Sequence, residues 1–315
     1  MENMSMKNEK IYVAGHNGLV GSAITRVLRE NGYKNVVFKL RTELDLLDHD
    51  AVNEFFKKEK PDHVFLAAAK CGGINDNIKN PVPFLLDNLR IQNNVIEAAH
   101  KYHVKKLMFL ASSCIFPRNS VQPIKEEYLL TGSLEPTNQY YAVAKIAGVK
   151  LCEAYRKQYK SNFISVNPCN VYGPKDNFSR ETGHVIGSMI SRFHDAKERD
   201  LKEVQCWGAG TSIREFIYVE DLAEACIHIM ENYDEAEVIN VGWGTGITIK
   251  DLADIVKNVV EYKGNIVWDT SKPDGMPKKV LCVDKLDQLG WRARTDLETG
   301  IKLTYDYFKV METNK

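Results

Sequence analysis

Short apolar segments alternate with longer amphipathic ones along the first half of the chain, and this alternation restricts the fold more than any other feature. The apolar segments are IYVAG, NVVFK, HVFLAAA, KLMFLAS and NFISVNP, and each precedes a helical pattern or a loop that leads to one. Strands that alternate with helices form a parallel sheet covered by helices on both faces. We therefore predict an α/β fold with a doubly wound parallel sheet.

The pattern is looser after Gly173, where it predicts a smaller C-terminal α/β lobe. The segments that follow are VQCWG, a helix at about 220–232, VINVG, a helix from near Thr248, NIVWD and a terminal helix from about Asp296. We therefore divide the chain into a first domain, residues 8–173, and a lobe, residues 174–315, with some exchange of chain between the two.

The charge balance and the cysteines exclude several classes of protein. The 42 Lys and Arg residues equal the 42 Asp and Glu residues in number, whereas domains that neutralise nucleic-acid phosphates are usually strongly basic. No apolar run approaches the ~18–20 residues of a membrane helix, and the N-terminus has no signal-peptide core. We expect a cytoplasmic protein that binds neither nucleic acid nor membrane.

Seven scattered cysteines, without a Cys-x-x-Cys pair, predict neither a metal site nor a disulfide framework. Six of them are predicted to be small buried hydrophobes. Cys114 is the exception because of its position, described below.

Three glycines at the first strand-to-helix turn predict a dinucleotide site. The strand at 11–14 runs into Gly15-His16-Asn17-Gly18-Leu19-Val20-Gly21, and a helical pattern follows at once. In such loops the first glycine permits a tight turn, the second lets the backbone approach the pyrophosphate, and the third lets the helix pack on the strand. The helix N-terminus then faces the phosphates. Residues 8–173 are therefore predicted to be a Rossmann domain, and the later lobe to cover the substrate.

The end of the second strand favours NADP(H) over NAD(H). An acidic residue there binds the 2′-hydroxyl of NAD, whereas an arginine accommodates the 2′-phosphate of NADP. We expect the strand NVVFKL to end at Arg41, and no carboxylate precedes Glu43. A solvated arginine at a strand end is the alternative interpretation of Arg41.

A Tyr-x-x-x-Lys pattern places a phenol and an ammonium one helical turn apart, so the charge can lower the phenol pKa and orient a nicotinamide ribose. The pattern occurs at Tyr102/Lys106, Tyr141/Lys145 and Tyr305/Lys309. Only Tyr141/Lys145 begins a helix after a strand that ends in hydroxyls, at Ser112 and Ser113. The carboxyl end of that strand faces the nicotinamide crevice of a doubly wound sheet. Ser112, Tyr141 and Lys145 are therefore predicted to converge on one carbonyl oxygen.

These residues, together with the glycine loop, make the chain resemble an extended short-chain dehydrogenase/reductase that acts on nucleotide sugars. Dehydratases of that superfamily carry Thr-Asp-Glu where this chain has Ser112-Ser113-Cys114. Within the superfamily the chain resembles the GDP-L-fucose synthases from about Lys10 to Phe308. The matching strings are SSCIFP from 112, AAAK from 67, LEPTN from 134, NVYGPKDNF from 170, HVI from 184, WG from 207, REF from 214 and SKPDG from 271.

The resemblance implies an enzyme that epimerises C3 and C5 of GDP-4-keto-6-deoxy-D-mannose and then reduces its C4 ketone with NADPH. Both protons flank the C4 carbonyl, so one oxyanion site, from Ser112 and Tyr141, can serve enolate formation and reduction. Cys114 is expected to be the base if its thiolate is favoured locally, and the family correspondence makes His184 the opposing acid. A packed thiol and a helix-capping histidine are the alternatives. The resemblance also implies a homodimer through helices at about 83–103 and 141–159.

The resemblance also implies the contacts to cofactor and substrate. The expected cofactor contacts are the glycine loop with His16, Asn17, Leu19 and Val20, and Arg41, Asp45, Leu46, Leu110, Ala111, Ser112, Lys145, Pro168, Asn170, Val171 and His184. The expected GDP-sugar contacts are Asn170, Arg192, Trp207, Arg214 and Asp274, because guanidinium groups suit a diphosphate and an aromatic or a carboxylate suits a base. Surface ion pairs for the arginines and a core position for Trp207 are the alternatives. No metal is expected.

Several departures from the family pattern leave the substrate open. Asn17 stands where the family often has Arg, Tyr140 and Gly187 stand where proline is common, and Cys169 stands where Thr is usual. A 4-reductase on a related GDP-4-keto-6-deoxy sugar or heptose, with or without epimerase activity, is therefore an alternative. A non-catalytic NADP-binding sensor and an NDP-sugar 4-epimerase with tightly bound NAD are more distant ones.

Overall fold

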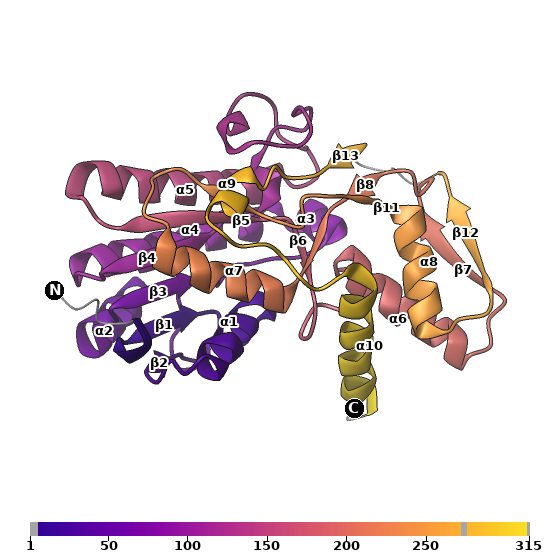
Figure 1. The fold of residues 1–315 in the computed structure, drawn as a ribbon, viewed down its shortest axis with the longest axis horizontal. Coiled ribbons are helices and arrows are strands. Elements are labelled where there is room, and N and C mark those ends of the chain that lie inside the picture. The colour runs from indigo at the N-terminus through magenta and orange to yellow at the C-terminus, as the bar shows by residue number, and fades with distance from the viewer. Residues whose placement is uncertain (1–5, 272–275, 314–315) are drawn as a thin grey trace.

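Six parallel strands form the central sheet of the computed structural model, which describes residues 6–271 and 276–313 (Figure 1). Their order across the sheet is β10-β5-β4-β3-β1-β2, and every neighbouring pair is parallel. The strands are β1 (Ile11–Ala14), β2 (Val36–Val37), β3 (His63–Leu66), β4 (Lys106–Leu110), β5 (Phe163–Pro168) and β10 (Ile239–Val241). Every residue of β1, β3, β4 and β5 is buried, as expected for strands covered on both faces.

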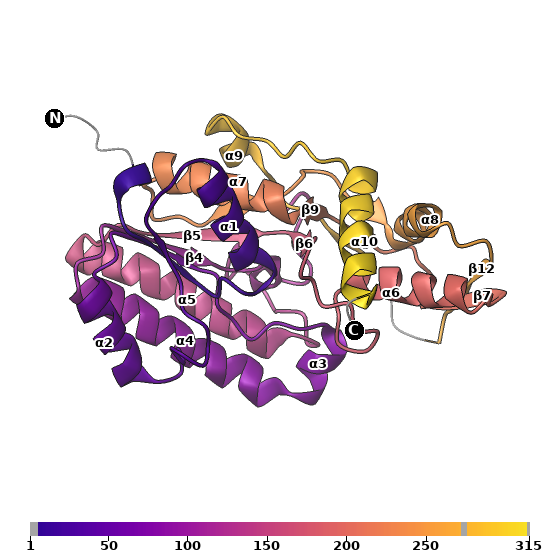
Figure 2. The same cartoon turned by 90° about the horizontal axis from the view of Figure 1, so that it is seen from below.

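Helices cover both faces of this sheet (Figure 2). On one face lie α2 (His49–Glu59), α4 (Pro81–Lys101) and α5 (Gln139–Tyr159), and α4 packs against both of the others. On the other face, α1 (Leu19–Glu30) packs against α7 (Val219–Asn232). The predicted doubly wound α/β sheet is confirmed.

A second lobe lies beside the sheet and has a hydrophobic core of its own. Its helices α6 (Val185–Glu198), α8 (Ile249–Val260) and α10 (Leu297–Thr313) pack together around buried side chains such as Phe193 and Ile301. The strands beyond the central sheet are β6 (Asn170–Tyr172), β7 (Glu203–Trp207), β8 (Ile213–Arg214), β9 (Phe216–Tyr218), β11 (Ile247–Thr248), β12 (Asn265–Asp269) and β13 (Lys278–Lys279). They form the small sheets β12-β7, β11-β8-β13 and β6-β9. Thr248 caps α8 by accepting from the Asp251 amide, as its place before that helix suggests.

The hydrophobic cores do not divide the chain at residue 173. Side chains of α7, β10 and α9 (Asp284–Gln288) belong to the core of the parallel sheet, although they follow residue 173 in the sequence. The reason is that α1 alone does not cover the second face of the sheet, and α7 packs beside it to complete the cover. The chain therefore crosses between the two cores more than once.

The second strand is shorter than the sequence predicts. β2 contains only Val36 and Val37, which pair with Ile11 and Tyr12 of β1. It is the edge strand, so it has one neighbour, and the chain leaves the sheet before Phe38. Arg41 consequently lies beyond the strand rather than at its end.

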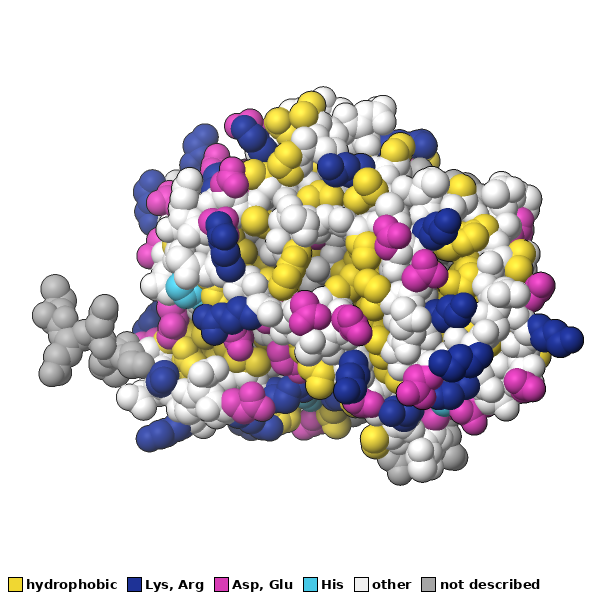
Figure 3. Space-filling view, turned by 45° about the vertical axis from the view of Figure 1, so that its right-hand side comes forward, with side chains coloured by type: hydrophobic (Ala, Val, Ile, Leu, Met, Phe, Trp, Pro, Cys, Tyr) yellow, Lys and Arg dark blue, Asp and Glu magenta, His cyan; other side chains and the backbone are white. Residues whose placement is uncertain are grey.

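The smaller elements are the short helix α3 (Ile74–Lys79) and three 3₁₀ turns at Met6–Asn8, Ser113–Ile115 and Glu126–Tyr128. Within the described residues no helix is long and apolar enough to span a membrane. Basic and acidic side chains alternate over the face in Figure 3, in keeping with the zero net charge.

Candidate active site

The glycine loop between β1 and α1 has the geometry that a dinucleotide requires. Gly15 has a φ of +86°, and a Cβ there would lie 2.7 Å from the Ala68 backbone. A Cβ on Gly21 would lie 2.2 Å from the Gly15 carbonyl oxygen, so the helix could not pack this close with any other residue. Gly18 caps α1 and faces open space apart from a contact at 3.5 Å. The loop thus leaves its backbone uncovered where a pyrophosphate would approach the helix N-terminus.

Several other predicted cofactor residues lie at or just after the carboxyl ends of central strands. Leu110 ends β4, Ala111 follows it, Pro168 ends β5, and Val171 lies in β6. Arg41 is 77% exposed, and its guanidinium lies 3.7 Å from the Asp45 carboxylate. Leu46 is buried below them in the main core.

The predicted Ser112, Tyr141 and Lys145 set is brought together at the carboxyl end of β4. Ser112 directly precedes the 3₁₀ turn after β4, and Tyr141 and Lys145 lie in the first two turns of α5. The Ser112 hydroxyl hydrogen-bonds both Tyr141 and Cys114. The Lys145 ammonium donates to the Leu110 carbonyl oxygen at 2.7 Å and lies 5.8 Å from the centre of the Tyr141 ring.

Burial dominates the electrostatics of this set. It raises the pKa of the Tyr141 phenol well above its usual value, with further contributions from Cys71 and Cys114, and only the hydrogen bond with Ser112 opposes it. Burial also lowers the pKa of Lys145. The phenol therefore stays protonated in this structure and can act as a proton donor, and the lowering of its pKa by Lys145 stays a prediction.

Cys71 is a contact of Tyr141 that the sequence prediction missed. Its sulfur lies 3.3 Å from the Tyr141 hydroxyl oxygen, and its side chain is exposed. The prediction that Cys71 is a buried hydrophobe is wrong, whereas Cys152, Cys169, Cys206, Cys226 and Cys282 are buried as predicted. Its position after β3, which pairs with β4, was the available signal, because the carboxyl ends of neighbouring parallel strands meet at one edge.

Cys114 is buried, 6% exposed, in the 3₁₀ turn two residues beyond Ser112. Burial raises the pKa of its thiol, while the Lys279 ammonium, the Ser112 hydroxyl and Lys145 lower it by smaller amounts. The structure therefore does not favour the thiolate at neutral pH. Lys279, in β13, is a basic neighbour of this thiol that the sequence prediction did not include.

His184 directly precedes α6, where its side chain is 43% exposed. It does not cap the helix through a side-chain hydrogen bond. Its Nδ1 lies 3.1 Å from the carboxylate of Asp176, which is 1% exposed and raises the pKa of His184. A buried carboxylate that holds one ring nitrogen leaves the other for a substrate, so the proton-donor form of His184 is favoured.

The predicted substrate residues are supplied by the second lobe and its junction with the sheet. Arg192 of α6 donates to the Gln205 carbonyl oxygen at 2.8 Å, and Arg214 of β8 donates to the Ile213 carbonyl oxygen at 2.8 Å. Trp207 ends β7 and is 51% exposed, so it is not a core residue. The Asn170 side chain donates to the Glu215 carbonyl oxygen at 2.7 Å. Asp274 lies outside the described residues.

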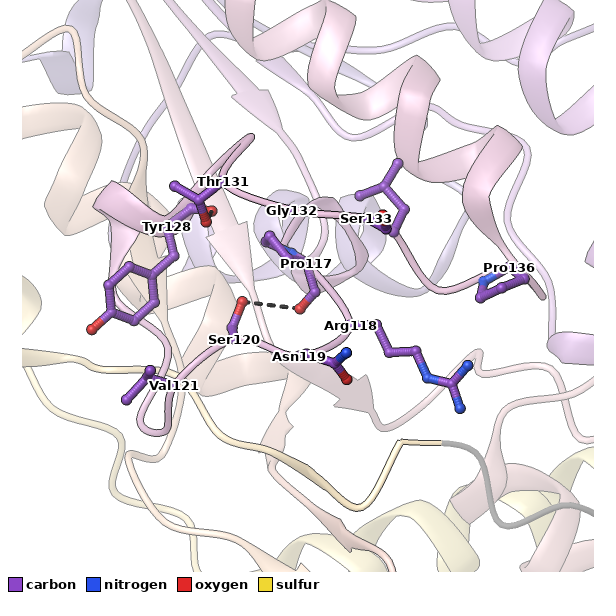
Figure 4. Close-up of a pocket in the computed structure, with 11 residues that line it drawn as sticks. Pro117, Arg118, Asn119, Ser120, Val121, Tyr128, Thr131, Gly132, Ser133 and Pro136 are labelled. Atoms are coloured by element: carbon purple, nitrogen blue, oxygen red, sulfur yellow. Dashed lines mark hydrogen bonds between the residues drawn. The ribbon is translucent and has the colours of Figure 1, made fainter.

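A cavity of about 450 Å³ lies in the loop that connects the 3₁₀ turn to α5 (Figure 4). It is lined by residues between Pro117 and Pro136, and Ser120 donates to the Pro117 carbonyl oxygen at 2.9 Å across its edge. None of its lining residues belongs to the predicted site. Among the described residues, no group of three or more His, Cys, Asp or Glu side chains could hold a metal ion.

Comparison with known proteins identifies the family. The model of the NAD dependent epimerase/dehydratase family matches residues 11–242, which include the glycine loop and the Ser112, Tyr141 and Lys145 set. The chain belongs to this family. It is 50% identical over 308 residues to GDP-L-fucose synthase 1 of Arabidopsis thaliana, which covers 98% of this chain and 95% of the plant protein.

Solved structures of similar proteins have the same fold. A GDP-L-fucose synthetase from Naegleria fowleri bound to NADP superposes with a TM-score of 0.91 at 31% identity, covering 98% of this chain and 94% of that one. A GDP-6-OMe-4-keto-L-xylo-heptose reductase from C. jejuni gives a TM-score of 0.92 at 38% identity, covering 97% of this chain and 99% of that one. Both neighbours are named for chemistry on GDP-sugars.

Proposed function

We propose that this protein is an NADPH-dependent GDP-L-fucose synthase, which epimerises GDP-4-keto-6-deoxy-D-mannose at C3 and C5 and then reduces C4. The observation that carries the proposal is the cluster of Ser112, Tyr141 and Cys114 hydroxyl and thiol groups at the end of β4. It occurs in a chain that is 50% identical to a GDP-L-fucose synthase over nearly its whole length. Tyr141 can donate a proton during reduction, and Cys114 can exchange one during epimerisation. One cluster can therefore serve both reactions at the same C4 ketone.

The residues around the glycine loop fit a dinucleotide, since each tight contact there excludes a Cβ and the helix N-terminus is open. When bound, NADPH supplies a hydride to the C4 carbon of the sugar. Tyr141 donates its proton to the C4 oxygen, because its raised pKa keeps the phenol protonated before hydride transfer, and Ser112 donates a hydrogen bond to the same oxygen. Lys145 holds the nicotinamide ribose. In this structure its ammonium is held 2.7 Å from the Leu110 carbonyl oxygen.

Epimerisation requires a base on one face of the sugar ring and an acid on the other. We assign Cys114 as the base and His184 as the acid. Asp176 supports the acid because it raises the His184 pKa. The Lys279 ammonium supports the base because it favours the thiolate against the effect of burial. Ser112 and Tyr141 stabilise the enolate oxygen that forms at C4.

The GDP group is assigned to the second lobe. Arg192 and Arg214 are proposed to bind the diphosphate, Trp207 to contact the guanine, and Asn170 to contact the sugar end. Asp274 remains a proposed guanine contact. Residues 174–315 would then be mainly the substrate-binding part, and residues 8–173 mainly the NADP-binding part.

A related GDP-4-keto heptose is the second candidate substrate, because the C. jejuni heptose reductase superposes at a TM-score of 0.92. The two substrates differ in the group attached at C5, so they test the sugar pocket and not the chemistry. A 4-reductase that does not epimerise would leave Cys114 and His184 without a role.

The decisive experiment is NADPH oxidation at 340 nm with GDP-4-keto-6-deoxy-D-mannose, with the product identified by NMR. We expect stoichiometric NADP⁺ release and GDP-L-fucose. A product with unchanged C3 or C5 would contradict the epimerase part, no consumption would favour the heptose, and tightly retained cofactor without net oxidation would favour a 4-epimerase. Cys114→Ser should lose much more epimerisation than reduction of an already epimerised ketone, and equal losses would contradict its role as base.

A homodimer is the proposed assembly, formed by α4 and α5 of each copy. Both helices carry exposed apolar side chains, with Val82 65%, Leu86 40% and Val143 46% exposed. We expect light scattering to give twice the mass of 35.8 kDa. Val143→Lys, which puts a charge on this surface, should give the monomer mass. A cytoplasmic location is part of the same proposal and is tested by cell fractionation.

A further inference from the structure

The amino group of Lys175 lies beside the glycine loop. Lys175 belongs to the turn after β6, and its Nζ donates to the Asn17 side-chain oxygen at 3.0 Å. The turn is tight, because the Asp176 amide donates to the Gly173 carbonyl oxygen at 3.1 Å and Lys175 itself has a φ of +68°. Few non-glycine residues occupy that left-handed region, so the contact depends on a specific backbone conformation.

The same amino group borders a cavity of about 370 Å³ beyond the end of β2. Phe38, the first residue after that strand, lines this cavity, and the His16 ring stacks on it with centroids 4.5 Å apart. In this fold the residues at the end of the second strand contact the 2′ position of the adenosine ribose. Lys175 therefore lies between the glycine loop and the residue that follows β2, near where a 2′-hydroxyl is distinguished from a 2′-phosphate.

The charges around this cavity leave Lys175 and Arg29 as its available cations. Arg26 is bound to Glu220, and burial together with Lys175 and Arg29 lowers the pKa of His16, which keeps that imidazole neutral. The Arg29 guanidinium lies 5.0 Å from the centre of the Phe38 ring, stacked on it.

Carboxylates are also present near this cavity. Glu30 lines it, and Glu43 lies close enough to His16 to raise its pKa. An anion in this cavity would therefore need a positive charge, such as the Lys175 ammonium, to offset the repulsion from Glu30 and Glu43. Arg41 is not among the residues that line this cavity; its side chain is 77% exposed, and its guanidinium lies 3.7 Å from the Asp45 carboxylate.

We propose that Lys175 recognises the 2′-phosphate of NADPH and supplies the positive charge that Asn17 lacks in the glycine loop. Asn17 itself is uncharged, so the charge beside the loop comes from a turn more than 150 residues later. The Asn17 side-chain oxygen accepts a hydrogen bond from the ammonium and so orients it. This assignment deepens the proposed function by naming the residue that selects its cofactor.

The test is direct binding of the reduced cofactors, measured by nicotinamide fluorescence in the absence of any sugar. Because a charge-assisted hydrogen bond is lost, Lys175→Ala should weaken NADPH binding roughly tenfold or more and change NADH binding by less than about twofold. Lys175→Arg should bind NADPH nearly as the wild type does. Adding Asn17→Arg to Lys175→Ala should restore NADPH affinity with little effect on NADH.

Lys57→Ala is the matched control, since Lys57 is an exposed lysine paired with Glu54 on α2. Equal weakening of NADPH and NADH by Lys175→Ala would overturn the proposal and indicate a pyrophosphate or structural role. Unchanged NADPH binding, or a large loss with Arg41→Ala instead, would overturn it as well. Since the titration contains no sugar, a failure to turn over GDP-4-keto-6-deoxy-D-mannose would contradict the proposed function and leave this result intact.

Discussion

Glu215 is a buried carboxylate that ties three segments of the chain together, and its titration should be visible in the stability of the protein. It is 1% exposed and accepts hydrogen bonds from the Gly244 amide at 2.6 Å and the Leu281 amide at 2.7 Å. The backbone carbonyl oxygen of Glu215 also accepts a hydrogen bond from the Asn170 side chain. Gly242 makes room for it, since a Cβ there would lie 2.1 Å from the carboxylate.

Burial raises the pKa of Glu215 from 4.5 to about 7, although the backbone hydrogen bonds oppose the effect. The folded protein therefore holds the proton more tightly than the unfolded chain does. Each pKa unit corresponds to 1.36 kcal/mol, so this group contributes about 3 kcal/mol of stability that is fully present below pH 4.5 and is lost as the pH rises towards 7. Between pH 5 and pH 8 the loss is about 2 to 3 kcal/mol.

Glu215→Gln removes this titration. The amide cannot accept from both backbone N–H groups, so at pH 5 the variant should be less stable than the wild type by about 1–3 kcal/mol. At pH 8 the wild type must bury a charge, and the difference should shrink to near zero or change sign. Urea unfolding of both proteins, followed by tryptophan fluorescence at the two pH values, measures it. A difference between the proteins that is the same at pH 5 and pH 8 would refute the reasoning.

Three further predictions concern the candidate active site. Gly21→Ala should lower the thermal stability by about 1–3 kcal/mol and weaken NADPH binding, because its Cβ would lie 2.2 Å from the Gly15 carbonyl oxygen; a variant with wild-type melting temperature and affinity would contradict this. Iodoacetamide should alkylate Cys71 first and abolish reduction in step with labelling, because the sulfur touches the Tyr141 hydroxyl; Cys71→Ala should resist, and equal inactivation of that variant would rule the contact out as the cause. Exchange of the C3 and C5 hydrogens in D₂O, followed by NMR without NADPH, should accelerate from pH 6 to pH 8.5, because the raised pKa of Cys114 leaves little thiolate at neutral pH; a rate that falls with pH would argue against a thiolate base.

Much of the parallel sheet was predictable because strands that are buried on both faces consist of nearly continuous apolar residues. The segments at 11–14, 63–66, 106–110 and 163–168 contain little else, and each is a strand. The glycine loop was also predictable from local sequence, since Gly15 and Gly21 meet backbone atoms that only a glycine clears. The edge strand β2 was predicted too long because the residues NVVFKL do not reveal that this strand pairs with β1 alone.

The contacts of the candidate site were harder to predict because they join segments that are distant in sequence. Cys71 reaches Tyr141 across 70 residues, and Lys175 reaches Asn17 across 158. The sequence also could not show that burial raises the Tyr141 pKa by more than the hydrogen bond with Ser112 lowers it. Both kinds of information depend on tertiary packing, which brings these segments together.

The two proposals place cofactor selection and the support of the catalytic acid on one turn, residues 173–176. One residue of the turn, Lys175, contacts the glycine loop, and the next, Asp176, holds His184. The backbone between these two side chains is a single peptide unit, so a movement of the turn backbone would move both side chains. If Lys175 binds the 2′-phosphate, a change in its position should alter the hydrogen bond that raises the His184 pKa. NADPH and NADH should therefore give different pKa values for His184 by NMR titration of its ring, and identical values with both cofactors would show that the two ends of the turn act independently.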